Sequence, residues 1–359
     1  MEKIVIHATN VTGLGACKVV DSILKSIDAM ESKNWEICCL LPSTGPISDF
    51  APRSEQVTVQ RVARRLPKSI SRIVEMLWPV SVTRHKPDWV LVLGDIPLRT
   101  RIPQLVFIQQ AHLISPSINA NSSPSWRYRV MRAIARLNAS CAKVVVCQTD
   151  AMAGDLIQTY PQWSIPNRVK VIRQPVPKGF RSRRPETTRD ANSRLKLFYP
   201  AAPYPHKNHG LFRELSESSI GEYVEKFVLT VSRSDVCLPE KVFHCIGPIN
   251  YSQCLEEYSR CDALVFPSLI ESYGLPLVEA MAMQKPILAA DLPYARTLCG
   301  SEAVYFDPRS ARSLYDGVKR LKAKLDSGWK PQWHGQLSLL PDSWEEVVKT
   351  LLGFLSLDE

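Results

Sequence analysis

The sequence predicts an α/β protein made of two halves, each with a parallel sheet and crossover helices. Three observations support this prediction. The chain has 359 residues, which is enough for two domains. Short apolar runs recur with helix-length stretches between them in both halves. A polar stretch rich in arginine and proline, residues 177–194, separates the two series and is typical of a linker.

The elements follow in order along the chain. In the first half, apolar runs predict the strands Ile4–His7, Trp35–Leu41, Trp89–Leu93, Leu105–Ile108 and Val144–Cys147, with a helix over Lys18–Met30. After the linker the strands are Leu195–Tyr199, Phe227–Val231, Phe243–Ile246, Ala263–Phe266 and Ile287–Ala290. A last helix is expected at about residues 343–355. The predicted domains are therefore 1–177 and 195–342, with a linker at 178–194 and a C-terminal helix within 343–359.

Charge is unevenly distributed between the halves. Residues 1–190 contain 27 Lys and Arg against 14 Asp and Glu, a net charge of +13, whereas residues 191–359 contain 18 against 21, a net of −3. The asymmetry indicates an anionic partner for the first half. No apolar run approaches membrane-spanning length, and the N-terminus lacks the layout of a signal peptide. Ten scattered cysteines without C-x-x-C spacing favour a reducing cytosol over disulfides or a zinc site.

Residues 262–308 are the most informative segment. An apolar strand leads through a turn into a helix, with Glu271 in the turn and Glu279 inside the helix. Gly274 allows a tight turn, and Pro276 suits the first helical position. A helix start at the carboxyl end of a strand is a natural phosphate site, and an acidic residue one turn later can reach a ribose diol. The pattern predicts a nucleotide site.

The string PSLIESYGLPLVEAMA at 267–282 resembles the signature of retaining glycosyltransferases of family 4, P-S-x-x-E-x-[FY]-G-L-P-x-x-E-A-M-A. The resemblance implies the GT-B fold, two Rossmann-like domains that face each other across a cleft. It also implies that the last helix crosses back to the N-terminal, acceptor-side domain. By this likeness Glu271 contacts the transferred sugar, while the donor is bound by Ser272, Tyr273, Gly274, Leu275 and Glu279.

Further donor-binding residues are predicted on both halves. Gly13 and Gly15 precede the first helix and resemble the family's glycine-rich loop, and Gly247 resembles its nucleotide-base element. Lys207 and Asn208 match the family's K-N element, although a solvated surface lysine would look the same. Relatives place an Arg about five positions earlier, where this chain has Ala202. Either another cation, such as Arg233 or Arg173, replaces it, or the loop is shifted.

His112 follows a predicted strand end, where the family commonly places a histidine near the donor sugar. The resemblance makes His112 the second catalytic candidate, contacting a sugar hydroxyl or stabilising charge. No D-x-D metal motif is present at a strand end. We therefore expect no metal and no cofactor, only a nucleotide sugar as substrate.

A basic region lies in the first half. Residues 51–143 contain 15 basic and 4 acidic residues, interleaved with apolar and aromatic ones. Such a pattern suits an anionic membrane surface, although a solvated basic helix face is an alternative. We found no nucleic-acid-binding signature. The predicted membrane or acceptor patch consists of Arg61, Arg64, Arg65, Lys68, Arg72, Arg129, Arg132 and Arg136.

Taken together, the residues and the resemblance predict a retaining, metal-independent glycosyltransferase. It would move a hexose or N-acetylhexosamine from a nucleotide sugar, with UDP as the expected base, to a polyprenyl-diphosphate-linked or other saccharide acceptor in surface polysaccharide assembly. The expected location is cytoplasmic, peripheral on the inner face of the membrane. Two alternatives remain: a GT-B epimerase, and a non-enzymatic protein that binds membranes or polyanions.

Overall fold

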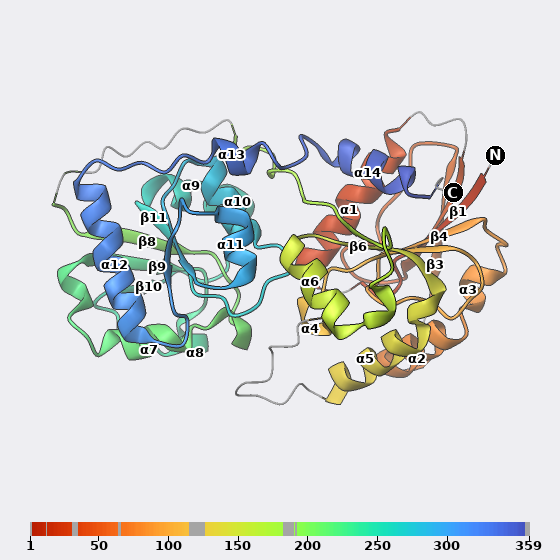
Figure 1. The fold of residues 1–359 in the computed structure, drawn as a ribbon, viewed down its shortest axis with the longest axis horizontal. Coiled ribbons are helices and arrows are strands. Elements are labelled where there is room, and N and C mark those ends of the chain that lie inside the picture. The colour runs from red at the N-terminus through yellow and green to blue at the C-terminus, as the bar shows by residue number, and fades with distance from the viewer. Residues whose placement is uncertain are drawn as a thin grey trace. The chain divides into compact units, whose positions relative to one another are not determined.

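The computed structural model describes residues 2–11, 13–30, 35–63, 66–114, 126–181, 190 and 192–355, without the side chains of Leu14 and Lys68. The chain divides into two compact units (Figure 1). The first comprises residues 1–175 together with 341–359, and the second comprises residues 176–340. The C-terminal segment thus belongs to the same unit as the N-terminus.

The first unit is built on a parallel sheet of seven strands in the order β3-β2-β1-β4-β5-β6-β7. The chain runs outward from β1 on one side and then returns to β4 on the other, so the strand order reverses between β1 and β4. The strands are β1 Glu2–His7, β2 Trp35–Pro42, β3 Val57–Val62, β4 Trp89–Val92, β5 Gln104–Phe107, β6 Ala142–Cys147 and β7 Val169–Val171.

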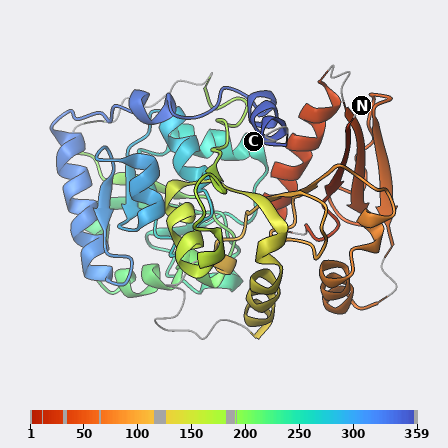
Figure 2. The same cartoon turned by 45° about the vertical axis from the view of Figure 1, so that its right-hand side comes forward.

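Helices cover both faces of this sheet. They are α1 Leu14–Asp28, α2 Lys68–Leu77, α3 Val80–Thr83, α4 Ala111–Ile114, α5 Trp126–Asn138, α6 Asp150–Thr159 and α14 Trp344–Gly353. Ile4 and Ile6 face a core shared with α1 and α14, whereas Val5 faces a second core with α2, α5 and α6. Figure 2 shows α14 beside α1, against which it packs. This packing anchors the C-terminal helix in the first unit.

The second unit has a parallel sheet of six strands in the order β10-β9-β8-β11-β12-β13. Its order reverses between β8 and β11. The strands are β8 Leu195–Tyr199, β9 Val224–Leu229, β10 Phe243–Cys245, β11 Ala263–Phe266, β12 Ile287–Ala290 and β13 Val304–Phe306. The helices are α7 Gly210–Ser216, α8 Arg233–Val236, α9 Tyr251–Arg260, α10 Leu275–Ala282, α11 Pro293–Cys299, α12 Ala311–Asp326 and α13 His334–Leu337.

The predicted fold class, two parallel α/β sheets, is confirmed. The predicted strands are present within a few residues of their expected bounds, whereas β3, β7 and β13 were not predicted. All three are edge strands. In the stretch expected to be a linker, Phe180 is fully buried in the core of the second unit, so this stretch begins as part of that unit. Most of the remaining linker, including residues 182–189, lies outside the described residues.

Among the helices that the structure describes, none combines the length and the apolar character needed to cross a membrane.

Candidate active site

The carboxyl ends of β8 and β11 are adjacent at the point where the strand order of the second sheet reverses. Loops that leave two such strands diverge to opposite sides of the sheet and leave an opening between them, which is where open α/β sheets bind ligands. The loop after β8 carries Lys207, and the loop after β11 carries Glu271. Two residues predicted from separate motifs thus belong to one place in the fold.

Lys207 and Glu271 form an ion pair across this opening. The ammonium Nζ lies 2.5 Å from the carboxylate Oε1, and the two side chains are only 16% and 11% exposed. The pair is therefore shielded from water more than an ordinary surface ion pair. An anion that approaches Lys207 must compete with Glu271 for the ammonium. The sequence alone allowed Lys207 to be an ordinary solvated surface lysine, and its burial and its ion pair exclude that alternative.

The main chain at Lys207 is fixed by its neighbours. The Tyr199 hydroxyl donates a hydrogen bond of 2.8 Å to the carbonyl oxygen of Lys207. Asn208 has a left-handed backbone (φ 59°), and its side-chain amide donates to the carbonyl oxygens of Pro267 and Pro308 at 3.2 and 2.8 Å. Asn208 therefore connects the loop after β8 to the loops after β11 and β13, and it orients the lysine rather than reaching outward itself.

His209 supports the same turn. It is buried, and its ring centroid lies 5.2 Å from that of Tyr199. Burial lowers the pKa of His209 to about 4, with the nearby charge of Lys207 acting in the same direction. The imidazole is therefore neutral near neutral pH and adds no second positive charge to the site.

The glutamate motif forms the start of α10. Gly274 is the N-cap and has φ +91°, a backbone conformation that residues with a Cβ rarely adopt. The helix begins at Leu275, one residue before the Pro276 that was expected to be its first residue. Tyr273 is buried, and Ser272 is half-buried at the mouth of the turn. The first turn of α10 and the Lys207–Glu271 pair are therefore brought to the same edge of the sheet.

Glu279 lies in the second turn of α10 and is half-buried. The Tyr258 hydroxyl oxygen lies 3.0 Å from Glu279 Oε2 and 3.1 Å from the Pro276 carbonyl oxygen, so its single proton is shared between these two acceptors. Burial raises the pKa of Tyr258 well above its ordinary value, with the Glu279 charge adding to the effect, so the phenol stays protonated as a donor. One carboxylate oxygen is therefore held in a fixed orientation.

Gly247 follows β10 and has φ +74°, so it also requires glycine on conformational grounds. Ala202 is exposed. Of the two cations considered as replacements for the missing arginine, Arg233 belongs to the same unit, at the start of α8, where it pairs with Glu240. Arg173 belongs to the first unit and contacts Asp150 at 2.7 Å. Of these two arginines, only Arg233 belongs to the unit that contains Lys207.

Sequence reasoning missed the tyrosines that hold the site together. Besides Tyr199 and Tyr258, the buried Tyr294 donates a hydrogen bond of 2.6 Å to the Ser268 carbonyl oxygen in the loop that carries Glu271. Their only sequence signal is a tyrosine in an otherwise apolar setting, which predicts burial but not a hydrogen-bond partner.

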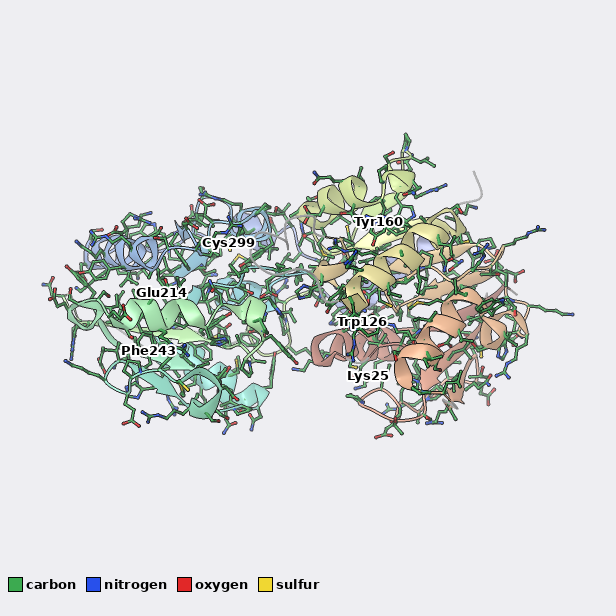
Figure 3. The ribbon with its side chains drawn as sticks, turned by 90° about the horizontal axis from the view of Figure 1, so that it is seen from below. Lys25, Trp126, Tyr160, Glu214, Phe243 and Cys299 are labelled. Atoms are coloured by element: carbon green, nitrogen blue, oxygen red, sulfur yellow. The ribbon has the colours of Figure 1, made fainter. Side chains whose placement is uncertain are left out.

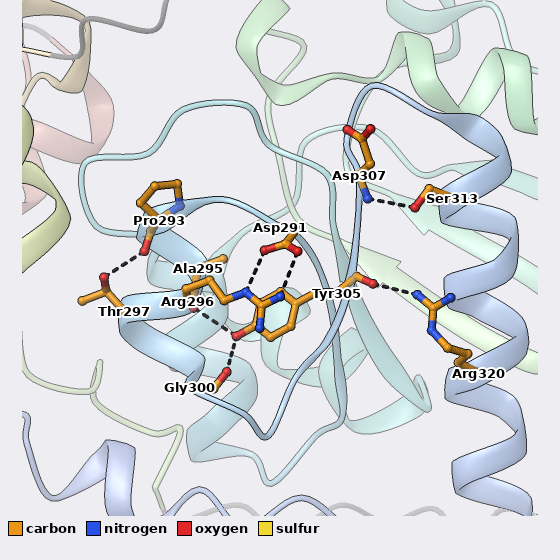
Figure 4. A network of polar contacts seen from close by, with 10 residues as sticks. All are labelled: Asp291, Pro293, Ala295, Arg296, Thr297, Gly300, Tyr305, Asp307, Ser313 and Arg320. Atoms are coloured by element: carbon orange, nitrogen blue, oxygen red, sulfur yellow. Dashed lines mark hydrogen bonds and ion pairs between the residues drawn. The ribbon is translucent and has the colours of Figure 1, made fainter.

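Asp291, Arg296 and Tyr305 form a cluster of contacts at the end of the neighbouring strand β12, called the polar brace below (Figure 4). Arg296 donates to both carboxylate oxygens of Asp291 at 2.7 and 2.8 Å, and its guanidinium carbon lies 3.7 Å from the centroid of the Tyr305 ring. The Arg296 hydrogen bonds lower the pKa of Asp291. The brace fixes α11 against β13 and is exposed, so we assign it to structure rather than to the site.

In the first unit, Gly13 is the N-cap of α1 and has an ordinary extended backbone (φ −72°, ψ 137°). Gly15 lies in the first turn of that helix, and an added Cβ at either glycine would meet no atom within 4 Å. Neither glycine is required by the backbone conformation. Both glycines are exposed.

His112 is half-buried in α4, and its ring centroid lies 5.2 Å from that of Tyr128. Arg132 donates a hydrogen bond of 2.9 Å to the His112 carbonyl oxygen. The turn before α4 is held by the buried Asp95, whose Oδ1 accepts from the backbone N–H of Gln109 at 2.6 Å. The position of His112 is therefore set by polar contacts from two neighbouring elements.

The structure describes the side chains of five of the eight residues predicted for the basic patch. Arg61 is exposed and donates to the Ser48 carbonyl oxygen at 2.9 Å, and Arg72 is half-buried near Asp95. Burial raises the pKa of Asp95, against the opposing effects of the backbone hydrogen bond from Gln109 and of the Arg72 charge. Of the three arginines on α5, Arg132 is half-buried, whereas Arg129 and Arg136 are exposed. Arg64, Arg65 and the Lys68 side chain lie outside the described residues.

Within the described part of the chain, no group of three or more His, Cys, Asp or Glu side chains is placed to hold a metal ion.

Residues 226–326, most of the second unit, match the model of the family described as Glycosyl transferases group 1. The matched range includes Glu271, Gly274 and Glu279 but not Lys207. The O-antigen chain mannosyltransferase RfbU of Salmonella typhimurium is 25% identical over 137 residues, which cover 35% of this chain and 38% of that protein. The match therefore spans well under half of this relative's length.

Two solved structures are similar over nearly the whole chain. WaaG, a glycosyltransferase involved in lipopolysaccharide biosynthesis, has a TM-score of 0.67 with 11% identity and 99% of each chain covered. HepE of Anabaena, in complex with UDP and glucose, has a TM-score of 0.65 with 15% identity and covers 99% of this chain and 100% of its own. At these identities the likeness establishes the fold, which is that of GT-B glycosyltransferases.

Proposed function

We propose that the protein is a retaining glycosyltransferase of family 4. It transfers a hexose or N-acetylhexosamine from a nucleotide sugar to a lipid-linked saccharide in surface polysaccharide assembly. The observation that carries the proposal is the shielded Lys207–Glu271 pair beside the start of α10. The match of residues 226–326 to Glycosyl transferases group 1 supports it independently.

The residues take the following roles. Lys207 neutralises the diphosphate of the donor, together with the backbone N–H groups at the start of α10. Glu271 accepts hydrogen bonds from hydroxyls of the transferred sugar, and Glu279, oriented by Tyr258, accepts from the ribose. In this scheme the largest catalytic contribution is the stabilisation of negative charge on the leaving diphosphate by groups already in place.

The proposed reaction retains the anomeric configuration by attack on the face from which the leaving group departs. The acceptor hydroxyl oxygen forms a bond to the anomeric carbon as the bond from that carbon to the diphosphate breaks. The hydroxyl proton passes to the departing phosphate oxygen, so no separate base is needed. In this scheme Glu271 positions the sugar and is not a nucleophile. His112 contacts a sugar hydroxyl or stabilises charge.

The relatives guide the choice of substrates. UDP, which is bound in the HepE structure, is the proposed nucleotide, and a hexose agrees with the glucose in that structure and with the mannose named for RfbU. The names of RfbU and WaaG refer to O-antigen and lipopolysaccharide, which favours a saccharide acceptor of that class. We propose a polyprenyl-diphosphate-linked acceptor, with the enzyme cytoplasmic and peripheral on the inner face of the membrane.

The test begins with the thermal stability of the purified protein in the presence of UDP, GDP, ADP, CMP or TDP and their sugars. Binding to the folded state raises Tm in proportion to the logarithm of ligand concentration. We expect one nucleotide family to raise Tm, with the same shift in EDTA because no metal is proposed. Glu271→Ala should abolish sugar transfer. If no nucleotide shifts Tm, or if Glu271→Ala transfers sugar at the wild-type rate, the proposal is wrong.

The same experiment separates the alternatives. An epimerase would convert its nucleotide sugar without an acceptor, whereas a transferase releases nucleoside diphosphate in step with glycosylated acceptor. A protein that only binds membranes or polyanions would do neither. The relatives reported above are named as transferases or bind UDP and glucose, so the epimerase alternative gains no support from them.

A further inference from the structure

Tyr204, in the loop after β8, presents an exposed aromatic ring next to the site. Most aromatic side chains of the second unit are buried, and Phe243, labelled in Figure 3, is one of them. Tyr204 is 54% exposed, and its ring stacks on the His206 imidazole with centroids 5.7 Å apart and planes 7° from parallel. A single exposed aromatic side chain is common on protein surfaces and by itself indicates no ligand. The rigidity of this ring and its attachment to the site set it apart.

The backbone of Tyr204 is held in one conformation. Pro203 and Pro205 flank it, and a residue that precedes proline is restricted to extended backbone. Tyr204 accordingly has φ −80° and ψ 145°, and its carbonyl oxygen accepts a hydrogen bond of 2.9 Å from the Lys207 backbone N–H. Because the chain here is already ordered, a ligand that packs on the ring loses little affinity to ordering the loop.

Hydrogen bonds join the stacked rings to the loop that carries Glu271. The His206 carbonyl oxygen accepts from the backbone N–H of Leu269 at 2.8 Å and from the Ser268 hydroxyl at 3.3 Å. Ser268 is itself buried, and its carbonyl oxygen accepts from the Tyr294 hydroxyl. The stack and the ion pair of the site therefore belong to one junction between the loops after β8 and β11.

The place of the stack relative to the donor follows from the roles assigned under the proposed function, on which this inference rests. Glu279 is assigned to the ribose, the start of α10 to the diphosphate and Glu271 to the transferred sugar. The order from ribose to sugar thus runs towards lower residue numbers. The next residues in that direction are Leu269 and Ser268, to which His206 is bonded. The stack therefore lies at the sugar end of the donor, which is the end that meets an acceptor.

The chemistry of the two rings suits a saccharide. A pyranose ring has a face of C–H groups, which packs on an aromatic ring, and a rim of hydroxyls, which need hydrogen-bond partners. Tyrosine and histidine both present an apolar body with a polar edge. Leu269, whose N–H binds the His206 carbonyl oxygen, adds an apolar side chain that is 37% exposed.

We propose that Tyr204 and His206 form a platform for the acceptor, on which the sugar that receives the transferred sugar is bound. The C–H face of that sugar packs on the Tyr204 ring, and one of its hydroxyls bonds to the edge of the His206 imidazole. Glu271 and the platform then hold the two sugars that the reaction joins. Tyr204 determines which acceptor is bound and takes no part in bond making.

Other ligands fit the platform less well. A nucleobase also stacks on aromatic rings, but in the proposed scheme it lies beyond the ribose, at the Glu279 end of the motif. A phosphate would contact the imidazole of His206 and gain nothing from the Tyr204 ring. An acyl chain requires a wider apolar surface than one aromatic ring and Leu269 provide.

Acceptor kinetics and saturation-transfer NMR test the proposal with the full chain. The test variant is Tyr204→Ala, and Tyr204→Phe restores the ring. The control is Tyr315→Ala on α12, which removes another tyrosine whose ring centroid lies 5.7 Å from that of an aromatic neighbour, Tyr223. The acceptor probes are octyl glycosides of mannose, glucose, galactose and N-acetylglucosamine, with the donor that raises Tm. The NMR probes are methyl glycosides of the same sugars in the presence of saturating UDP.

We expect Tyr204→Ala to raise KM for the best acceptor about two- to twelvefold. The ring contributes equally before and during the reaction, so kcat and KM for the donor should stay near wild type. The variant should also lose most of the saturation transfer to the glycoside, while Tyr204→Phe should recover most of both losses. Tyr315→Ala should behave like wild type, and UDP should raise the Tm of every variant equally.

The proposal is overturned if Tyr204→Ala keeps the wild-type KM for the acceptor, or if no glycoside receives saturation from the wild-type protein. It is also overturned if Tyr204→Ala weakens UDP binding, because the ring would then stack on the base. A wild type that saturates a glycoside through Tyr204 but transfers no sugar would refute the proposed function while supporting a saccharide platform. The two proposals can therefore fail separately.

Discussion

Glu271→Gln should strengthen the binding of free UDP while it abolishes sugar transfer. In the structure the Lys207 ammonium lies 2.5 Å from the Glu271 carboxylate. A diphosphate that binds to Lys207 must displace this carboxylate. Glutamine keeps the size of the side chain but removes the charge, so the ammonium becomes available to phosphate. Sugar hydroxyls, in contrast, lose a charged acceptor, because the amide keeps one neutral acceptor oxygen and replaces the other with an NH2 donor, and transfer fails.

The magnitude follows from the geometry of the pair. Two unit charges at this separation attract by about 7 kcal/mol at an effective dielectric constant of about 20, which is a gross upper bound. Solvation of both groups reduces the net value, and a pair this well shielded should retain about 1–2 kcal/mol. In Glu271→Gln the diphosphate no longer competes with a carboxylate for the Lys207 ammonium, so UDP should bind about five- to thirtyfold more tightly. Lys207→Met should act in the opposite direction, since removing a charged hydrogen bond costs about 1.5–3 kcal/mol.

Isothermal titration of UDP into the wild type and both variants measures these effects. Asp291→Asn is the control, because it removes a carboxylate from the end of a neighbouring strand that is paired to Arg296 rather than to Lys207. The control should leave UDP affinity unchanged. If Glu271→Gln weakened UDP binding as Lys207→Met does, Glu271 would contact the nucleotide rather than compete with it, and the reasoning would be refuted.

Three further predictions follow from the site. Gly274→Ala forces a Cβ onto a backbone with φ +91°, so Tm and UDP affinity should both fall, whereas Gly328→Ala, at φ +81° outside the site, should lower Tm alone. Burial lowers the pKa of His209 to about 4, so the folded state resists protonation. The neutral His209 side chain therefore contributes up to about 3 kcal/mol to the free energy of unfolding above pH 6.5, and this contribution is lost as the pH falls towards 4. In urea titrations His209→Phe should show a weaker dependence of the unfolding free energy on pH. Tyr258→Phe releases the orienting hydrogen bond to Glu279, and KM for the donor should rise severalfold with kcat nearly unchanged; a fall in kcat alone would contradict the assigned role.

The sequence predicts the interior of each sheet better than its edges. Central strands such as Val90–Val92 are buried on both faces, so they read as continuous apolar runs. The edge strand β3 includes Gln60 and Arg61 and is only partly buried, while β7 and β13 have three residues each. Short or half-exposed strands carry less of the pattern on which prediction depends, although the three-residue edge strand β10 was predicted from its apolar run.

The site shows the same division between local and non-local information. Glu271, Gly274 and Glu279 belong to one short string, so a pattern can find all three. The contacts that orient Lys207 join residues far apart in sequence, such as Asn208 with Pro308, and nothing in the local sequence indicates which carbonyl oxygen the amide will meet. The chemical groups could be predicted, whereas the hydrogen bonds that hold them in place could not.

The basic region shows why composition does not locate a surface. On α2, Met76 is buried in the core, and Ile73 and Leu77 are partly buried against it. Ile70 and Val74 are neighbours of Ile73 and Leu77 on the same apolar face of α2, yet they are 49% and 38% exposed. Arg61 is exposed although its guanidinium donates to the Ser48 carbonyl oxygen, so a hydrogen bond to the main chain does not by itself take an arginine away from solvent. The apolar face of α2 is wider than the part of it that the core covers, and only the folded chain shows where that cover ends.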